Sequence, residues 1–352
     1  MTERKISHDP AGMMGLVAGF GEQLRSAALL AADGPSLMEG VSPSRIYVAG
    51  MGGSAIGGDY LRALMADRCP TPVEVVRSYT LPAGADPSAF VFFVSYSGNT
   101  EEVLSCWAEA RTRGVPGCAV TSGGALAEAA AAAGVPTLRI PGGLPPRAAL
   151  GWTSVPLLHA VAEAGLIEQD GNALEEAATV VEEIVSESGP HATGENRVAQ
   201  WAERAARGLP MIYASAGLTA PGVTRWVCQL NENAKLLAHG CLLPEQNHNE
   251  IVGWEVPSRA GEMAEVAFLN DSGVHPRVRL RMEIVAASVE AAGGRPTWFS
   301  SRGQSAVARL YSLSILGDLA SLWAASARSI DPTPVDSIVR LKQDLASAEK
   351  RG

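Results

Sequence analysis

The chain has 352 residues, of which 47% are hydrophobic and 18% are charged, and its formal net charge is −9 at pH 7. This length exceeds the usual size of one hydrophobic core, so we expect a soluble globular protein with two domains. The acidic balance argues against nucleic-acid binding, because phosphate backbones are bound by clustered lysine and arginine. No apolar stretch approaches the roughly 20 residues that cross a bilayer, so we expect no membrane segment.

The N-terminal stretch MTERKISHDPAG lacks the apolar core of a signal peptide. The cysteines are odd in number, scattered and without metal-ligand spacing: Cys69, Cys106, Cys118, Cys228 and Cys241. Such a pattern is typical of reduced thiols, most of them in the core. We therefore expect a cytoplasmic protein.

Apolar runs alternate with helical stretches along the first half of the chain. Strands are predicted at 45–50, 73–76, 90–94, 118–121 and 137–140, with helices at 55–65, 101–113 and 125–133. Strands that are separated by helices favour a parallel sheet with crossover helices.

A polar segment with Gly and Pro, EIVSESGPHATGEN at 183–196, indicates a boundary. After it the alternation resumes, with strands predicted at 211–215, 266–270 and 296–300 and helices at 219–239, at 278–291 and from 305 onward. The sequence therefore predicts two α/β domains of similar size.

Hydroxyl side chains follow the buried strand in VFFVSYSGNTEEV, residues 91–103. Ser95, Ser97 and Thr100 lie where the strand ends, which is where open parallel sheets bind their ligands. Asn99 and Thr100 are natural N-cap residues for the next helix. Hydroxyls, backbone N–H groups and a helix N-terminus together suit a phosphate. The alternative is an ordinary strand–turn–helix connection with a capping residue.

The segment VAGMGGSAIGGDYL, residues 48–61, repeats this order: an apolar strand, a glycine-rich turn, Ser54 and a helix. It is not a Walker A loop, because no Gly-Lys-Ser/Thr ends it, and its glycines lack the dinucleotide-binding spacing. Serine hydroxyls at two strand ends of one predicted sheet favour a phosphate site more than either segment does alone.

A third segment, QLNENAKLLAHGCLLPEQNHNEIVGWE at 229–255, places several titratable residues among apolar ones. A metal site is not expected, because His239 and His248 are nine residues apart and no HExxH or cysteine pairing occurs. A Glu and a His brought together from different elements suit proton transfer. The alternative is a charged helix face, with Glu232 and Lys235, followed by a polar loop.

Seven blocks of sequence together resemble the bifunctional phosphoglucose/phosphomannose isomerase family of archaea and bacteria. They are GMGGSAIGGDYL, SYSGNTEEV, PPRAALG (145–151), NENAK (231–235), NHNEIVGWE (247–255), RGQSAVARLYSLSILGDLAS (302–321) and DPTPVDSIVRLK (331–342). The resemblance runs from about residue 9 to residue 342 in the same order. The glutamate of NENAK, followed sixteen residues later by the histidine of NHNE, is its most specific feature.

The resemblance implies an α/β fold with two sugar-isomerase domains, each a doubly wound parallel sheet flanked by helices, in a homodimer. The expected divisions are an N-terminal helical segment (1–40), a first domain (41–165), an acidic connector (166–196), a second domain (197–330) and a C-terminal helix (331–352). The connector resembles an amphipathic helix with a linker.

The resemblance also implies a set of site residues. Those for the substrate phosphate are Gly52, Gly53, Ser54, Ser95, Ser97 and Thr100. Glu232 matches the base that moves a proton between C1 and C2 of the open-chain sugar. His248 matches a residue that assists ring opening and that reaches the site from the neighbouring subunit. Arg147 matches the arginine that stabilises the enediolate, and Lys342 falls where the family has a lysine near the ring oxygen.

The implied reaction interconverts glucose 6-phosphate, mannose 6-phosphate or both with fructose 6-phosphate through a cis-enediol(ate). It involves no net oxidation and no transfer to a second molecule, so no cofactor is expected. Arg147 has an alternative role as a helix cap or a surface ion-pair partner, because Pro145 and Pro146 mark a loop.

Two alternative functions remain: a non-catalytic sugar-phosphate-binding regulator, and an isomerase narrowed to another sugar phosphate. A regulator of this fold usually carries a DNA-binding segment. Only about 40 residues precede the first predicted strand, with no basic helix-turn-helix pattern. Glu232 and His248 favour the enzyme.

Overall fold

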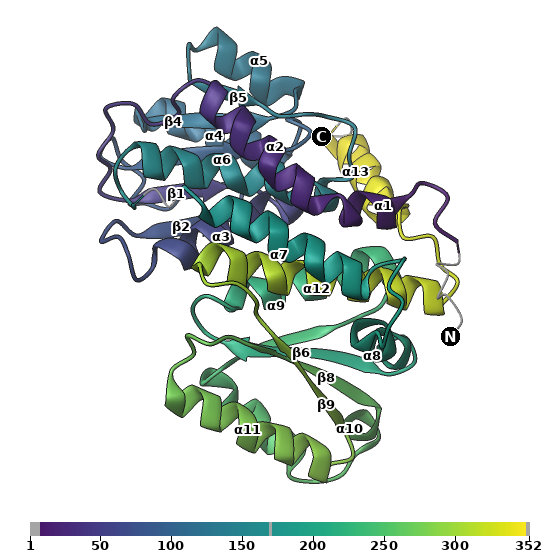
Figure 1. The fold of residues 1–352 in the computed structure, drawn as a ribbon. Coiled ribbons are helices and arrows are strands. Elements are labelled where there is room, and N and C mark those ends of the chain that lie inside the picture. Colours follow the sequence, from purple (N-terminus) through teal and green to yellow (C-terminus); the bar gives the residue numbers. More distant parts are fainter. Residues whose placement is uncertain (1–7, 169–170, 350–352) are drawn as a thin grey trace.

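The computed structural model describes residues 8–168 and 171–349, and it consists of two parallel β-sheets with a layer of helices between them (Figure 1). The first sheet has the order β2-β1-β3-β4-β5, and the second has the order β7-β6-β8-β9. Every neighbouring pair of strands is parallel. The predicted α/β fold with two parallel sheets is confirmed.

The strands of the first sheet are β1 (Ile46–Ala49), β2 (Val73–Val76), β3 (Phe90–Val94), β4 (Gly117–Thr121) and β5 (Thr137–Arg139). Those of the second are β6 (Leu209–Ser215), β7 (His239–Leu243), β8 (Ala264–Asn270) and β9 (Arg295–Ser300).

The helices of the N-terminal half are α1 (Met13–Ala18), α2 (Phe20–Asp33), α3 (Gly52–Met65), α4 (Glu101–Arg113), α5 (Gly124–Ala132), α6 (Leu150–Glu163) and α7 (Ala173–Ser188). Those of the C-terminal half are α8 (Arg197–Ala205), α9 (Ala220–Ala234), α10 (Arg259–Met263), α11 (Pro276–Ala291), α12 (Ala306–Ala327) and α13 (Asp336–Glu349). Three 3₁₀ turns, η1 (Pro146–Ala148), η2 (Glu245–His248) and η3 (Glu250–Trp254), lie in connections.

Side chains alternate between two cores along each strand. In β1, Ile46 and Val48 join the central core between the sheets, whereas Tyr47 and Ala49 join an outer core that α4 and α5 cover. Because both faces of the strand are buried, its sequence is a continuous apolar run rather than an alternating one. The second sheet has the same arrangement, with α11 over its outer face (Figure 1).

The long helix α12 forms the middle of the central core. It packs against α7, α8 and α9, and nearly all its side chains are buried. The expected connector at 166–196 contains α7, whose Val181 and Ile184 are fully buried in this same core. None of the helices within the described residues combines the length and apolar character that a membrane crossing requires.

One predicted element is wrong. The helix expected at 219–239 ends at Ala234, because Lys235 adopts the left-handed conformation with φ 51°. His239 then begins the edge strand β7, which was not predicted from the sequence. Gly240 in this strand allows α9 to pack closely, since a Cβ atom there would lie 2.5 Å from Val223.

Candidate active site

Two turns rich in serine and glycine lie side by side at the carboxyl ends of β1 and β3. We call them the first serine loop (residues 50–54) and the second serine loop (residues 95–100). They are neighbours because β1 and β3 pair directly in the sheet. The backbone N–H of Tyr96 donates to Ser54 Oγ over 3.1 Å, which joins the two loops.

Hydrogen bonds fix the hydroxyls of the second serine loop. Ser95 Oγ lies 2.8 Å from Thr100 Oγ1 and accepts from the backbone N–H of Gly98 over 3.0 Å. The Ser97 hydroxyl accepts from the backbone N–H of Asn99 over 3.3 Å. Ser54 and Ser95 are buried, whereas Ser97 is exposed. The loop therefore holds its hydroxyls in an ordered arrangement, with Ser97 exposed, Thr100 partly exposed and Ser95 buried behind them.

The helices after the two loops begin without a side-chain cap. Met51 is the N-cap residue of α3 and Thr100 that of α4, and neither side chain accepts a capping hydrogen bond. Thr100 therefore occupies the predicted N-cap position, but its hydroxyl bonds Ser95 instead. Two helix N-termini without a side-chain cap, next to each other, form a natural site for an anion.

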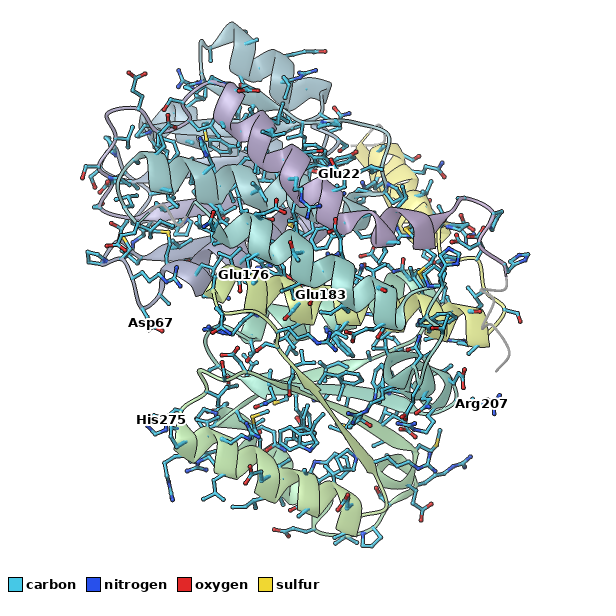
Figure 2. All side chains as sticks on the ribbon, in the orientation of Figure 1. Glu22, Asp67, Glu176, Glu183, Arg207 and His275 are labelled. Atoms are coloured by element: carbon cyan, nitrogen blue, oxygen red, sulfur yellow. The ribbon has the colours of Figure 1, made fainter. Side chains whose placement is uncertain are left out.

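The matching end of the second sheet differs in charge. A cavity of about 500 Å³ lies there, and its lining includes the buried carboxylate of Asp271, which pairs with Arg309. Asp67 and His275 also line it, and both lie at the same side of the molecule in Figure 2. Neither serine loop contains an acidic residue. The end of the first sheet thus combines hydroxyls and helix N-termini with no carboxylate in either serine loop.

Arg147 connects the first serine loop with the second half of the chain. It lies in η1, which packs so closely on Gly53 that a Cβ atom there would be 2.7 Å from the Pro146 carbonyl oxygen. Its Nε donates to Asn233 Oδ1 over 2.6 Å, and its Nη2 donates to the carbonyls of Pro332 and Thr333 over 2.7 and 2.8 Å. With 4% exposure, Arg147 is a buried, fixed cation rather than a surface arginine.

Glu232 lies on the last turn of α9, with its Oε2 3.7 Å from Arg147 Nη1. Burial raises the pKa of this carboxyl, and the charges of Arg147, Arg225 and Lys235 oppose that rise. Burial likewise lowers the pKa of Arg147, against the opposing charges of Glu232 and Asp331. The site thus holds a partly buried carboxylate beside a guanidinium that cannot move away.

Lys235 and Asn233 were not among the predicted site residues, although both belong to the NENAK block. Lys235 Nζ donates to the carbonyls of Glu232 and Pro332, over 2.7 and 3.0 Å. Asn233 accepts from Arg147 and donates to Ser321 Oγ over 2.9 Å. The residues that flank Glu232 therefore fix the end of α9 and the Arg147 side chain.

A buried hydrogen-bond network between α9 and α12 contacts the backbone of Arg147. Arg225 Nη2 donates to Asp318 Oδ2 over 2.6 Å and to the Arg147 carbonyl over 3.0 Å. Gln229 Nε2 donates to Asp318 Oδ1 over 2.8 Å. This network was not predicted from the sequence. Asp318, the single acidic residue of α12, was the available signal, because a buried charge requires a partner.

His248 is not brought to this site within one chain. It is exposed at the end of η2, and nothing in the described part of the chain joins it to Glu232 or Arg147 by a hydrogen bond or ion pair. Its neighbour Asn247 accepts from Arg281 of α11 over 3.3 Å, so His248 lies on the outer side of the second sheet.

Nothing in the described part of the chain joins Lys342 to Glu232 by a hydrogen bond or ion pair either. Lys342 belongs to α13, which is exposed from residue 336 to residue 348, and within residues 8–168 and 171–349 it forms no ion pair. This helix starts three residues after Thr333, whose carbonyl binds Arg147. The C-terminal segment thus contacts the site at Pro332 and Thr333, just before α13 begins.

Comparisons with known proteins concern the family and the fold. A model described as the bacterial phospho-glucose isomerase C-terminal SIS domain matches residues 194–345, and a SIS domain model matches residues 41–137. A hypothetical protein from Thermus thermophilus has a similar structure, with a TM-score of 0.73, 15% identity and coverage of 97% of this chain and 92% of that chain. That likeness supports the fold alone.

Curated relatives are more informative because their sequences match over most of both chains. A bifunctional phosphoglucose/phosphomannose isomerase of Caldicellulosiruptor bescii is 39% identical over 86% of this chain and 89% of its own length. One of the same description from Aquifex aeolicus is 35% identical, over 85% and 90%. The chain therefore belongs to the bifunctional phosphoglucose/phosphomannose isomerase family.

Proposed function

We propose that this protein interconverts glucose 6-phosphate, mannose 6-phosphate or both with fructose 6-phosphate through a cis-enediol(ate) intermediate. The observation that carries the proposal is the 3.7 Å separation of Glu232 Oε2 and Arg147 Nη1 next to the first serine loop. A carboxylate that moves a proton and a fixed cation that stabilises the resulting oxyanion are the groups this isomerisation requires.

The two serine loops bind the substrate phosphate, which anchors the sugar. The residues that bind it are Gly52, Gly53, Ser54, Ser95, Ser97 and Thr100. Hydroxyl groups and two helix N-termini without a side-chain cap support this role, as does the lack of acidic residues in the loops.

Glu232 acts as the base that takes the C2 proton and returns it to C1. Its burial makes the carboxylate a stronger base, because the raised pKa brings it closer to neutral pH. The charges of Arg147, Arg225 and Lys235 oppose this rise and favour the ionised form of the group. Each positioned acid or base is worth about 10²–10⁴-fold in rate.

Arg147 stabilises the enediolate oxygen on which negative charge develops. Its Nε and Nη2 are fully engaged by Asn233 and by two backbone carbonyls, so the guanidinium is fixed before the reaction begins. A fixed donor loses little reorganisation energy when the charge appears. A lysine in its place would lack the planar, multi-donor geometry.

His248 assists ring opening from the partner subunit of a homodimer. Its exposure and its separation from Glu232 within one chain support this arrangement. Large apolar side chains are exposed on the same outer side of the second sheet: Val252 at 59%, Leu280 at 43% and Ile284 at 52%. Such an exposed apolar surface is typical of an interface between proteins.

Lys342 approaches the ring oxygen from α13. The closeness of residues 332 and 333 to Arg147 supports a role for this helix, which also exposes Ile338 and Leu341. The reaction itself needs no cofactor, because it neither oxidises the sugar nor transfers a group. All five cysteines are free thiols, which supports a cytoplasmic location.

The test is a coupled assay that offers fructose 6-phosphate, glucose 6-phosphate and mannose 6-phosphate to the wild type and to Glu232→Gln. We expect isomerisation by the wild type, and a loss of about 10²–10⁴-fold in kcat in the variant with fructose 6-phosphate binding retained. Glu183→Gln, which removes an exposed carboxylate on α7, is the control and should keep full activity. An unchanged rate in Glu232→Gln would refute the assignment of the base.

The same assay separates the two alternatives from the proposal. A sugar-phosphate-binding regulator would bind fructose 6-phosphate without interconverting any of the three sugars. An isomerase narrowed to another sugar phosphate would leave all three unchanged while its serine loops still bound inorganic phosphate.

A further inference from the structure

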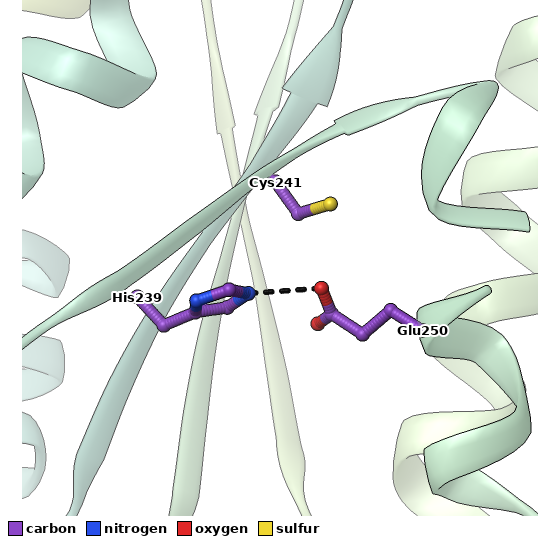
Figure 3. Close-up of side chains that lie close together, drawn as sticks. All are labelled: His239, Cys241 and Glu250. Carbon is purple, nitrogen blue, oxygen red and sulfur yellow. Dashed lines mark hydrogen bonds and ion pairs between the residues drawn. The ribbon is translucent and has the colours of Figure 1, made fainter.

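Three potential metal ligands meet on the outer side of the second sheet, away from Glu232. His239 and Cys241 lie two residues apart on β7, so their side chains project from the same face of the strand. Glu250 approaches them from η3 (Figure 3). The sequence spacing did not suggest this group, because the helix expected at 219–239 would have placed His239 and Cys241 on separate elements.

The donor atoms are already close together. His239 Nε2 lies 2.8 Å from Glu250 Oε2, and the imidazole nitrogen, the thiol sulfur and the carboxylate oxygen all lie within 4.8 Å of one another. In a tetrahedral zinc site the bond lengths of about 2.0–2.3 Å place such atoms roughly 3.3–3.7 Å apart. Small side-chain movements therefore suffice for all three to bind one ion.

Two neighbours hold Glu250 in position, one through its carboxylate and one through its backbone. The Tyr213 hydroxyl donates to Glu250 Oε1, and the backbone N–H of Glu250 donates to Asn249 Oδ1 over 2.5 Å. Tyr213 is fully buried, so its hydroxyl is fixed. Partners of this kind orient the ligands of metal sites and tune their affinity.

We propose that His239, Cys241 and Glu250 form a binding site for a borderline-soft divalent cation of the zinc type. A nitrogen, a sulfur and an oxygen ligand together select such an ion over magnesium or calcium, which prefer oxygen ligands alone. The imidazole of His239 is half exposed, so an ion can enter and a fourth ligand can bind from solvent. Ion binding at these three residues does not depend on the proposed isomerase activity.

The three ligands enclose a short stretch of chain. His239 and Cys241 precede it and Glu250 follows it, so residues 242–249 lie between them, with η2 and His248. A bound ion would therefore tie together the two ends of this segment. It would stabilise the native state, because the unfolded chain does not hold the three ligands together.

Cobalt(II) titration of the purified, metal-free protein tests the site directly. Binding by the Cys241 thiolate should produce a thiolate-to-cobalt charge-transfer band that saturates at one ion per chain and that zinc abolishes by displacement. Loss of a direct ligand should weaken zinc binding by more than the roughly 10–100-fold that a supporting residue causes. Cys241→Ser and His239→Gln should thus both lose the band, with circular dichroism confirming that they fold.

Two matched controls make the result decisive. Cys69→Ser removes a partly buried thiol elsewhere in the chain. His248→Ala removes the histidine that lies between Cys241 and Glu250 in the sequence. Both variants should bind cobalt as the wild type does. The proposal is overturned if the wild type gives no thiolate band. It is equally overturned if Cys241→Ser keeps the band, or if His248 is required in place of His239.

Discussion

Arg147 Nη1 and Glu232 Oε2 face each other at 3.7 Å, which is longer than the 2.7–3.2 Å or so of a direct N–H···O hydrogen bond. The guanidinium is held elsewhere, by Asn233 and by the carbonyls of Pro332 and Thr333. It therefore lowers the cost of the buried carboxylate charge without occupying the carboxylate oxygen. That oxygen stays available to take a proton from a substrate.

The pH dependence of activity should follow from this pair. Burial raises the pKa of Glu232 above its ordinary value of 4.5, and Arg147 opposes the rise. Because the base must be ionised, the acid limb of kcat/KM should lie above pH 4.5 and should move to higher pH in Arg147→Gln. Arg147→Lys, which keeps the charge, should move the limb less while still lowering kcat. A limb that stays in place or moves to lower pH in Arg147→Gln would contradict this coupling.

Gly98 should tolerate substitution much less than Gly114. The two glycines have nearly equal φ values, 71° and 69°, so the backbone strain of an alanine is the same at both positions. A Cβ atom at Gly98 would lie 1.7 Å from the Gly123 carbonyl oxygen, whereas at Gly114 the nearest atom, on Pro87, is 4.0 Å away.

Urea unfolding and steady-state kinetics measure the difference. Gly114→Ala should cost about 1–2 kcal/mol from its backbone conformation alone, and Gly98→Ala about 1–3 kcal/mol more from the overlap. Only Gly98→Ala should raise KM, because it displaces the second serine loop. Equal stability and equal KM in the two variants would show that the loop does not depend on this contact.

The buried pair between Arg225 and Asp318 should be among the most sensitive in the molecule. Both side chains are nearly inaccessible, and Asp318 also accepts from Gln229. Asp318→Ala should lower the free energy of unfolding by about 3–5 kcal/mol, because it leaves a buried guanidinium without its counter-ion. Glu283→Ala, which breaks the exposed i,i+4 pair with Arg279, should cost only about 0.3–0.5 kcal/mol. Similar losses of unfolding free energy in the two variants would show that burial does not make the Arg225–Asp318 pair more important than an exposed pair.

The sequence was sufficient to predict every strand of the described structure except β7. Fully buried strands such as β3 are continuous apolar runs, and serine and glycine follow β1 and β3 where the sheet ends. Strand β7 was missed because KLLAHGCLL continues the apolar spacing of α9. Only the left-handed backbone of Lys235 ends the helix there.

The contacts that the sequence did not predict in the candidate site are tertiary ones. Arg147 binds carbonyls 185 and 186 residues further along the chain, and Asn233 binds Ser321. Backbone carbonyls carry no sequence signal, so no spacing in the chain predicts these contacts. The approach of Glu250 to His239 likewise depends on how the segment after β7 folds back.

Sharing of the site between two subunits is the last prediction. Glu232 and His248 lie apart within one chain, so each proposed site takes Glu232 from one subunit and His248 from the other. Glu232→Gln and His248→Ala homodimers should both be nearly inactive. In a heterodimer of the two variants, one site combines both substitutions and the other has neither, so mixed chains should regain up to about half of the wild-type activity per heterodimer. Subunit exchange, shown by tagged chains that copurify, is the necessary control. Subunit exchange without regained activity would show that His248 does not belong to a shared site. A monomeric protein in sedimentation analysis would exclude a site shared between subunits.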